Sequence, residues 1–232
     1  MGMVAEEQAV TARPRIVFRK RRRVLPLELV FLRPLPAWKR AIDIVGSVLG
    51  LIISSPVMVL AAVAVKLTSP GPVIFKQERA GVGGKRFIFY KFRSMVDGAD
   101  ALKKFLLDQN EQSGPAFKMR NDPRMTRVGR FLRSTSIDEL PQLWNVLKGN
   151  MSLVGPRPPT LDEVPRYAPW QRERLEVTPG ITGIWQISGR SNVKFENWVR
   201  MDIQYIRRRS LLLDLQILWG TAQAVFLRRG AH

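Results

Sequence analysis

An uncharged apolar stretch covers residues 44–65 and restricts what the chain can fold into more than any other feature. Most of its residues are Val, Ile, Leu, Ala or Met, and about 20 such residues are enough for a helix to cross a bilayer. Ser54, Ser55 and Pro56 interrupt it. Because proline lacks an N–H and clashes with the carbonyl four residues earlier, we expect a helix kink at Ser55-Pro56, where serine hydroxyls satisfy the freed backbone groups.

Basic residues flank the apolar stretch on both sides. Lys39 and Arg40 precede it, and Lys66, Lys76 and Arg79 follow it. Since Lys and Arg favour the cytoplasmic side of a membrane, both ends are expected there. We therefore predict a kinked, re-entrant membrane helix over residues 34–67. A straight span and a buried core helix of a soluble protein remain alternatives.

Positive charge dominates the composition, with 38 Lys and Arg against 19 Asp and Glu and a net charge of +19. This excess predicts an anionic partner, which could be nucleic acid, a membrane surface or a phosphorylated substrate. Residues 1–33 form a basic arm without periodicity, expected either to lie near anionic lipid headgroups or to be a solvated tail. The arm does not resemble a signal peptide.

Cysteine is absent and the single histidine is His232. Disulfides and zinc–thiolate sites are therefore excluded, and histidine catalysis is disfavoured. Carboxylates, arginines and lysines are left to carry any chemistry.

The residues after the apolar stretch predict an α+β fold that is mainly helical, with one small β-hairpin. The β-rich runs 73–77 and 86–92, separated by a glycine-rich turn, predict the hairpin. Helical spacing predicts helices over residues 97–107, 138–149 and 198–227. The last of these is expected to form interfacial amphipathic helices or, alternatively, a core helix pair. Residues 68–232 would thus be a cytoplasmic catalytic domain on a monotopic membrane protein.

The acidic pair Asp138-Glu139 lies in strongly basic surroundings, behind arginines at positions 124, 127, 130 and 133. We expect the pair at a helix N-terminus, with Ser136 and Glu139 as a capping box or with Asp138 as the first residue, where the helix dipole would lower both carboxyl pKa values. Side chains of neighbouring helical residues diverge by about 100°, so one carboxylate can attack phosphorus while the other holds a metal ion. Mg²⁺ suits so few carboxylates, and Arg133 and Arg157 could bind a diphosphate.

This pattern favours an enzyme acting on a phosphorylated substrate over two other classes of protein. A non-enzymatic nucleic-acid- or lipid-binding protein would explain the charge but not the acidic pair. The sequence also lacks interleaved stacking aromatics or a nucleic-acid motif, so nucleic acid is not an expected partner. The other competing class is a single-span structural subunit, in which the catalytic-looking loops would serve only as scaffolding.

Several motifs, in order and in spacing, resemble the bacterial sugar transferase family, the monotopic phosphoglycosyl transferases that prime glycan assembly. They are Lys91-Phe92-Arg93-Ser94-Met95 and the segments 122–142, 149–158 and 179–183. The similarity extends from about Trp38 to the C-terminus. The additional N-terminal membrane helices of larger family members are expected to be absent.

The resemblance implies transfer of a sugar 1-phosphate from a UDP-sugar to polyprenol phosphate, with release of UMP. Asp138 would attack the phosphate that bears the sugar and form a covalent intermediate, and Asp138 and Glu139 would hold Mg²⁺. The residues implied in substrate binding are Arg133, Arg157, Lys91 and Arg93. Ser55-Pro56 matches the kink of the family's re-entrant helix.

The resemblance also bears on the sugar and on the location of the protein. Segment 184–190, which contains Trp185, is more similar to members that use glucose or galactose, although simple packing of the aromatic side chain is an equal alternative. The implied location is the cytoplasmic face of the bacterial inner membrane, at the first step of exopolysaccharide or glycan assembly. The sequence leaves open whether the chain forms a homodimer.

Overall fold

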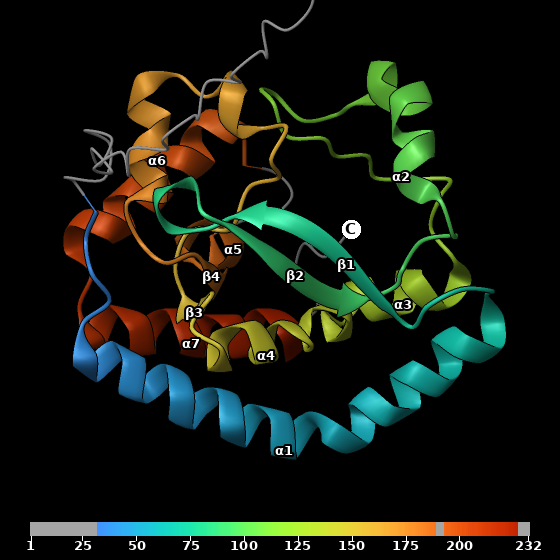
Figure 1. Cartoon of the computed structure of the whole chain (residues 1–232), viewed down its shortest axis with the longest axis horizontal. Coiled ribbons are helices and arrows are strands. Elements are labelled where there is room, and N and C mark those ends of the chain that lie inside the picture. Colours follow the sequence, from blue (N-terminus) through green and yellow to red (C-terminus); the bar gives the residue numbers. More distant parts are fainter. Residues whose placement is uncertain (1–31, 189–192, 227–232) are drawn as a thin grey trace, which may run out of the picture.

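One long helix, α1 (Ala37–Thr68), curves along a whole side of the protein (Figure 1). The computed structural model describes residues 32–188 and 193–226, so nearly all of the predicted basic arm lies outside the described residues. Pro56 lies inside the helix. The carbonyl of Ile52, which Pro56 leaves without its usual donor, accepts a hydrogen bond from Ser55 Oγ at 2.8 Å. The expectation that serine satisfies the freed backbone group is confirmed.

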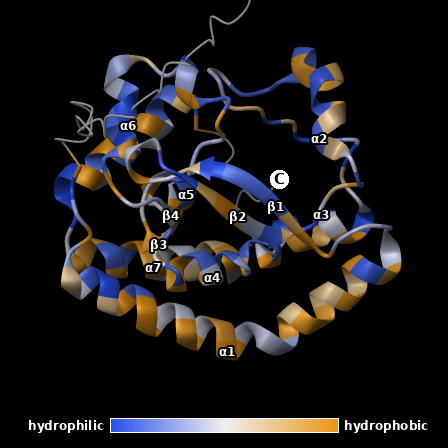
Figure 2. Ribbon diagram, viewed as in Figure 1, coloured by the Kyte–Doolittle hydropathy of each residue, from blue (hydrophilic) through white to orange (hydrophobic). Residues whose placement is uncertain are grey.

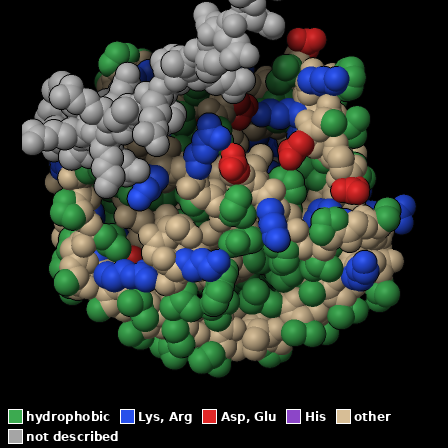
Figure 3. Space-filling model, in the orientation of Figure 1, with side chains coloured by type: hydrophobic (Ala, Val, Ile, Leu, Met, Phe, Trp, Pro, Cys, Tyr) green, Lys and Arg blue, Asp and Glu red, His purple; other side chains and the backbone are tan. Residues whose placement is uncertain are grey.

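The outer face of α1 is apolar and exposed. Helix α1 is the one helix in the described part of the chain that is long and apolar enough to cross a membrane. Side chains such as Ile53, Leu60 and Leu67 are 70–80% exposed, and apolar side chains follow the edge where α1 lies (Figures 2 and 3). Only 11% of its apolar window is buried, whereas a core helix of a soluble protein is mostly buried.

The predicted hairpin is present. Strands β1 (Ile74–Ala80) and β2 (Arg86–Phe92) pair antiparallel, with Ile74 opposite Phe92. Their turn contains Gly83 and Gly84 at φ of 62° and 73°, which glycine adopts without strain. Phe92 packs with Val65 of α1, so the hairpin and the apolar helix share a core.

The next helices differ from the prediction. Helix α2 (Ala99–Leu102) passes into a 3₁₀ segment, Lys103–Gln109, instead of continuing. Leu102, Phe105 and Leu107 are exposed, so this segment lacks the packing that stabilises a longer helix. The sequence did not predict α3 (Arg127–Ser134).

After α3, the described chain contains helix α4 (Gln142–Leu147), two short strands and three further α-helices. The 3₁₀ segments Ile137–Glu139, Val164–Arg166 and Pro169–Leu175 lie between them. Strands β3 (Ser152–Val154) and β4 (Gly180–Thr182) pair in parallel and are too short to produce a sequence signal. They approach closely, because a Cβ on Gly180 would lie 2.1 Å from the nitrogen of Gly155. Helix α5 (Ile184–Ile187) follows β4. The predicted C-terminal helices are α6 (Phe195–Arg208) and α7 (Leu211–Phe226).

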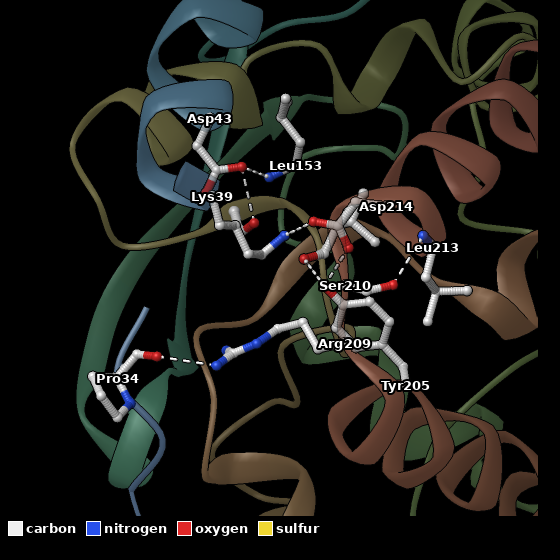
Figure 4. Close-up of polar contacts among 11 residues, drawn as sticks. Pro34, Lys39, Asp43, Leu153, Tyr205, Arg209, Ser210, Leu213 and Asp214 are labelled. Atoms are coloured by element: carbon white, nitrogen blue, oxygen red, sulfur yellow. Dashed lines mark hydrogen bonds and ion pairs between the residues drawn. The ribbon is translucent and has the colours of Figure 1, made fainter. Parts of the chain in front are cut away.

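A buried polar network joins the start of α1 to the rest of the protein (Figure 4). Lys39 Nζ pairs with Asp214 of α7 at 2.5 Å, and both side chains are 3% exposed. The other oxygen of Asp214 accepts a hydrogen bond from the hydroxyl of Tyr205 at 2.8 Å. One helical turn after Lys39, Asp43 accepts the backbone N–H of Leu153 in β3 at 2.9 Å. Removing one partner of such a buried pair leaves an uncompensated charge.

Arg40 makes a further connection of the same kind. Its guanidinium donates to the carbonyls of Val146 and Leu147, both at 2.7 Å. These carbonyls end α4 (Gln142–Leu147), where a cation is favourable. Lys39 and Arg40 are thus bound to protein groups, which corrects their interpretation as plain flanking charges.

Candidate active site

A cavity of about 680 Å³ contains the polar residues that the sequence analysis selected. This volume is in the usual range for a small-molecule site. Residues of the hairpin, of the segment from α3 to α4 and of strand β4 line it. The selected residues in its lining are Lys91, Arg93, Arg133, Asp138, Glu139 and Arg157. Ser55 and Pro56 lie in α1 instead.

The acidic pair lies in a tight 3₁₀ turn, Ile137–Glu139, and the α-helix that follows begins only at Gln142. Ser136 before it has a φ of 58° and makes no side-chain cap. The predicted helix N-terminus at Asp138 and the predicted capping box are therefore wrong. The predicted end is right, because Gly149 follows α4 at a φ of 81°.

Asp138 is the more buried member of the pair, with 4% exposure. Burial, followed by repulsion from Glu139, raises the pKa of Asp138 to about 6, although Lys91 and Arg133 oppose the rise. The prediction that the pKa of this carboxyl is lowered is wrong, because burial outweighs the nearby positive charge. Asp138 is a stronger base than an exposed aspartate and is still largely ionised at neutral pH, as a nucleophile requires.

Glu139 has a different environment. Its Oε1 accepts a hydrogen bond from Arg157 Nη1 at 2.8 Å, and the two side chains are 23% and 24% exposed. Burial acts to raise the pKa of Glu139, but Arg157 and the other cations outweigh burial and the net pKa is lowered. The two neighbouring carboxyls are therefore electrostatically distinct.

Two further cations border the acidic pair. Burial, with repulsion from Arg133, lowers the pKa of Lys91 to about 8. Arg79, which the sequence analysis treated only as a flanking charge, also lines the cavity, and burial with repulsion from Arg157 lowers its pKa to about 10. Arg79 donates to the carbonyl of Pro158 at 3.0 Å. The sequence alone does not predict that Arg79 lies in the cavity, because this position depends on the pairing of the hairpin with segment 158–160.

The carboxylates of the acidic pair are the candidate ligands of the predicted Mg²⁺. In residues 32–188 and 193–226 no group of three or more acidic, histidine or cysteine side chains could hold a metal ion. Mg²⁺ commonly uses one or two protein carboxylates and completes its shell with water and substrate phosphates. Asp138 and the second oxygen of Glu139 fit such an ion, which would bind together with a diphosphate.

Arg93 and Trp185, which the sequence analysis also selected, lie in other parts of the cavity lining. Arg93 is 5% exposed and donates to Ser69 just after α1. Trp185 lines the cavity and stacks on Trp198, with ring centroids 4.3 Å apart. Gly189 and Arg190, the end of the segment used to predict the sugar, lie outside the described residues.

Sequence comparisons show which proteins the chain is similar to. The family model described as bacterial sugar transferase matches residues 35–228. Galactosyl transferase CpsE of Streptococcus agalactiae is 49% identical over 194 residues, which are 83% of this chain and 43% of that protein. UDP-glucose:undecaprenyl-phosphate glucose-1-phosphate transferase of Klebsiella pneumoniae is 43% identical over 203 residues, 84% of this chain and 41% of that protein.

A third relative has a similar length. Exopolysaccharide production protein ExoY of Rhizobium meliloti is 39% identical over 213 residues, which cover 90% of this chain and 94% of that protein. The chain thus matches ExoY over nearly its whole length but spans less than half of CpsE and of the Klebsiella protein. By the extent of the family match and by these identities, the chain belongs to the bacterial sugar transferase family.

Proposed function

We propose that the protein transfers a hexose 1-phosphate from a UDP-sugar to polyprenol phosphate and releases UMP. The observation that carries this proposal is the buried carboxyl of Asp138, whose pKa is raised by burial in a cavity lined by cations. Relatives named for galactose or glucose transfer to a lipid carrier support the substrate class. The first step of exopolysaccharide assembly at the cytoplasmic face of the inner membrane is the corresponding role.

In the first half-reaction, a carboxylate oxygen of Asp138 attacks the phosphorus that bears the sugar. The bond from this phosphorus to the bridging oxygen breaks, and UMP leaves with the electron pair. Arg133, Arg157 and Lys91 neutralise the diphosphate and orient it. Mg²⁺ held by Glu139 and Asp138 would supply further charge neutralisation when bound.

In the second half-reaction, a phosphate oxygen of the lipid acceptor attacks the same phosphorus. The bond between Asp138 and phosphorus breaks, so the carboxylate is restored and the lipid-linked diphosphosugar leaves. Since one residue carries the sugar phosphate between two substrates, the kinetics are expected to be ping-pong.

A UMP-release assay tests the proposed function. Detergent-solubilised protein receives Mg²⁺, undecaprenyl phosphate and one of UDP-glucose, UDP-galactose or UDP-N-acetylglucosamine. UDP-glucose or UDP-galactose should support continuous UMP release, and omission of the lipid should limit release to one equivalent. Unphosphorylated undecaprenol is the matched control. No UMP with any of the sugars would eliminate the transferase proposal.

We also propose that α1 is re-entrant, with both ends at the cytoplasmic face. In support, both ends bond to the same body: Pro34 accepts from Arg209 at 3.1 Å, and Ser69 accepts from Arg93 at 2.8 Å. Cysteines introduced singly at Arg33 and Lys76 should react with an impermeant thiol reagent from the same side of a vesicle. The native chain has no cysteine that could interfere. Labelling from opposite sides would instead indicate a straight span.

The pKa values predict how the first half-reaction depends on pH. Attack requires ionised Asp138, so kcat/KM for the UDP-sugar should fall as pH drops through about 6. Substrate binding uses protonated Lys91, so kcat/KM should also fall as pH rises through about 8. Lys91→Arg keeps its charge and should retain the acid limb but lose the alkaline limb. An unchanged alkaline limb in this variant would remove Lys91 from the explanation.

A further inference from the structure

Arg93 and Ser94, just after β2, carry buried polar atoms without partners in the lining of the cavity. Arg93 is 5% exposed and Ser94 is 2% exposed. The Nε and Nη1 atoms of Arg93 and the hydroxyl of Ser94 are buried and make no hydrogen bond. Buried polar groups nearly always have a partner, since an unpaired one has a substantial desolvation cost. Unpaired groups of this kind in a cavity indicate that a ligand supplies the partner.

The guanidinium of Arg93 is held in a fixed position. Its Nη2 donates to the backbone oxygen and the hydroxyl of Ser69, both at 2.8 Å, at the C-terminal end of α1. Gly71 lies directly against it at a φ of 105°, and a Cβ there would be 2.2 Å from Nη1. The backbone between α1 and β1 thus leaves room for this guanidinium and orients its two unpaired nitrogens.

Two arginines of the cavity pair with carboxylates, but in the described part of the chain Arg93 does not. Arg157 pairs with Glu139, and Arg124 pairs with Asp122 at 2.6 Å. No ion pair of Arg93 exists within the described residues. The nearby carboxyl of Asp97 accepts the backbone N–H of Gly98. The positive charge of Arg93 is therefore available to an anion.

The location of Arg93 distinguishes between the two anionic substrates. The donor diphosphate must lie against Asp138, beside the Glu139–Arg157 pair. Arg93 lies instead against Ser69, where α1 ends, and the last turns of α1 carry exposed apolar side chains such as Val63 and Leu67, which are 50% and 80% exposed. A phosphate monoester on an apolar chain can place its headgroup in the cavity and its chain along this surface.

We propose that Arg93 and Ser94 form the subsite for the phosphate group of the lipid acceptor. This inference rests on the proposed function and adds to it by assigning the second substrate to particular residues. The unpaired nitrogens of Arg93 donate to phosphate oxygens, and the hydroxyl of Ser94 donates to a third. The phosphate is thereby held for attack on the phosphosugar of Asp138.

Separate measurement of the half-reactions tests this subsite. The first is followed as UMP formed in a single turnover without lipid, and the second as transfer from the isolated phosphosugar enzyme to undecaprenyl phosphate. Arg93→Met should lower kcat/KM for the lipid at least tenfold more than kcat/KM for the UDP-sugar. Ser94→Ala should act in the same direction with a smaller effect, and Arg93→Lys should recover part of the loss.

A control variant separates binding of the lipid phosphate by Arg93 from a general effect of positive charge. Lys66→Met removes an exposed cation at the end of α1 that does not line the cavity, and should change kcat/KM for the lipid less than twofold. Equal losses in both half-reactions of Arg93→Met, or an equal loss in Lys66→Met, would overturn the subsite. Absence of UMP from the native protein would instead contradict the proposed function.

Inorganic phosphate distinguishes the lipid headgroup from a free anion as the source of the phosphate. Orthophosphate should compete weakly with undecaprenyl phosphate in the native protein and lose this competition in Arg93→Met. The lipid should bind far more tightly, because its apolar chain contributes. Competition of orthophosphate with the UDP-sugar alone would assign Arg93 to the donor and refute the proposal.

Discussion

Replacing Asp138 with asparagine should abolish the covalent phosphosugar and reduce turnover by at least about 10³-fold, as expected when a catalytic nucleophile is removed. The side chain keeps its size, so the cavity should be unchanged. Mass spectrometry of the protein after incubation with the UDP-sugar should show the added mass in the native chain and not in the variant. Full turnover by Asp138→Asn would exclude the covalent mechanism even if the activity itself were confirmed.

The same substitution should make the protein more stable. A carboxyl whose pKa is higher in the folded than in the unfolded chain destabilises the fold at a pH above both values. The penalty shrinks as pH falls below the folded value and is gone below the unfolded value. Because the pKa of Asp138 is raised to about 6, the penalty applies at neutral pH. Asn should remove it and raise the free energy of unfolding by about 2 kcal/mol. Thermal unfolding should show the full gain at neutral pH, and the gain should vanish as pH falls from about 6 to the unfolded value of about 4.

Replacing Arg157 with methionine should reduce kcat/KM for the UDP-sugar by about 10²-fold or more, the usual effect of losing a charged contact to a transition state. Its loss also leaves Glu139 without its partner at 2.8 Å. Arg157 lowers the pKa of both acidic residues, so both values should rise in the variant. The acid limb of the pH profile should therefore move to higher pH.

Arg157→Lys is the matched control for this prediction. Lysine keeps the positive charge but cannot make the planar, two-pronged contact of arginine. The position of the acid limb should stay near that of the native protein, while kcat/KM remains reduced. An acid limb that does not move in Arg157→Met would show that Arg157 does not set the electrostatics of the acidic pair.

Local features of the sequence were enough to predict several parts of the fold. The hairpin follows from glycines between β-rich runs, and the bonding of Ser55 around Pro56 follows from the chemistry of proline in a helix. Arg133, Asp138, Glu139 and Arg157 were selected by their types and spacing, whereas Lys91 and Arg93 were implied by the resemblance to the family. These properties depend on neighbours along the chain, which is why they can be predicted.

Other properties depend on contacts between distant residues. The raised pKa of Asp138 comes from burial, and burial is a result of packing that the sequence does not specify locally. Arg79 joins the site through its approach to Pro158, and β3 pairs with a strand that follows much later. The hydrogen bonds that remain unmade at Arg93 could be recognised only when its surroundings were known.

Side chains at the start of α1, the proposed membrane anchor, fix this helix rigidly to the elements that carry the candidate active site. Asp43 holds β3, and β3 leads within a few residues to Arg157. Arg40 holds the end of α4, the helix that follows the acidic pair. With α1 in the membrane as proposed, a thicker or thinner bilayer would tilt the whole protein and leave the geometry between α1 and the two carboxylates unchanged. An anchor transplanted from another protein would have to bring matching side chains for these contacts.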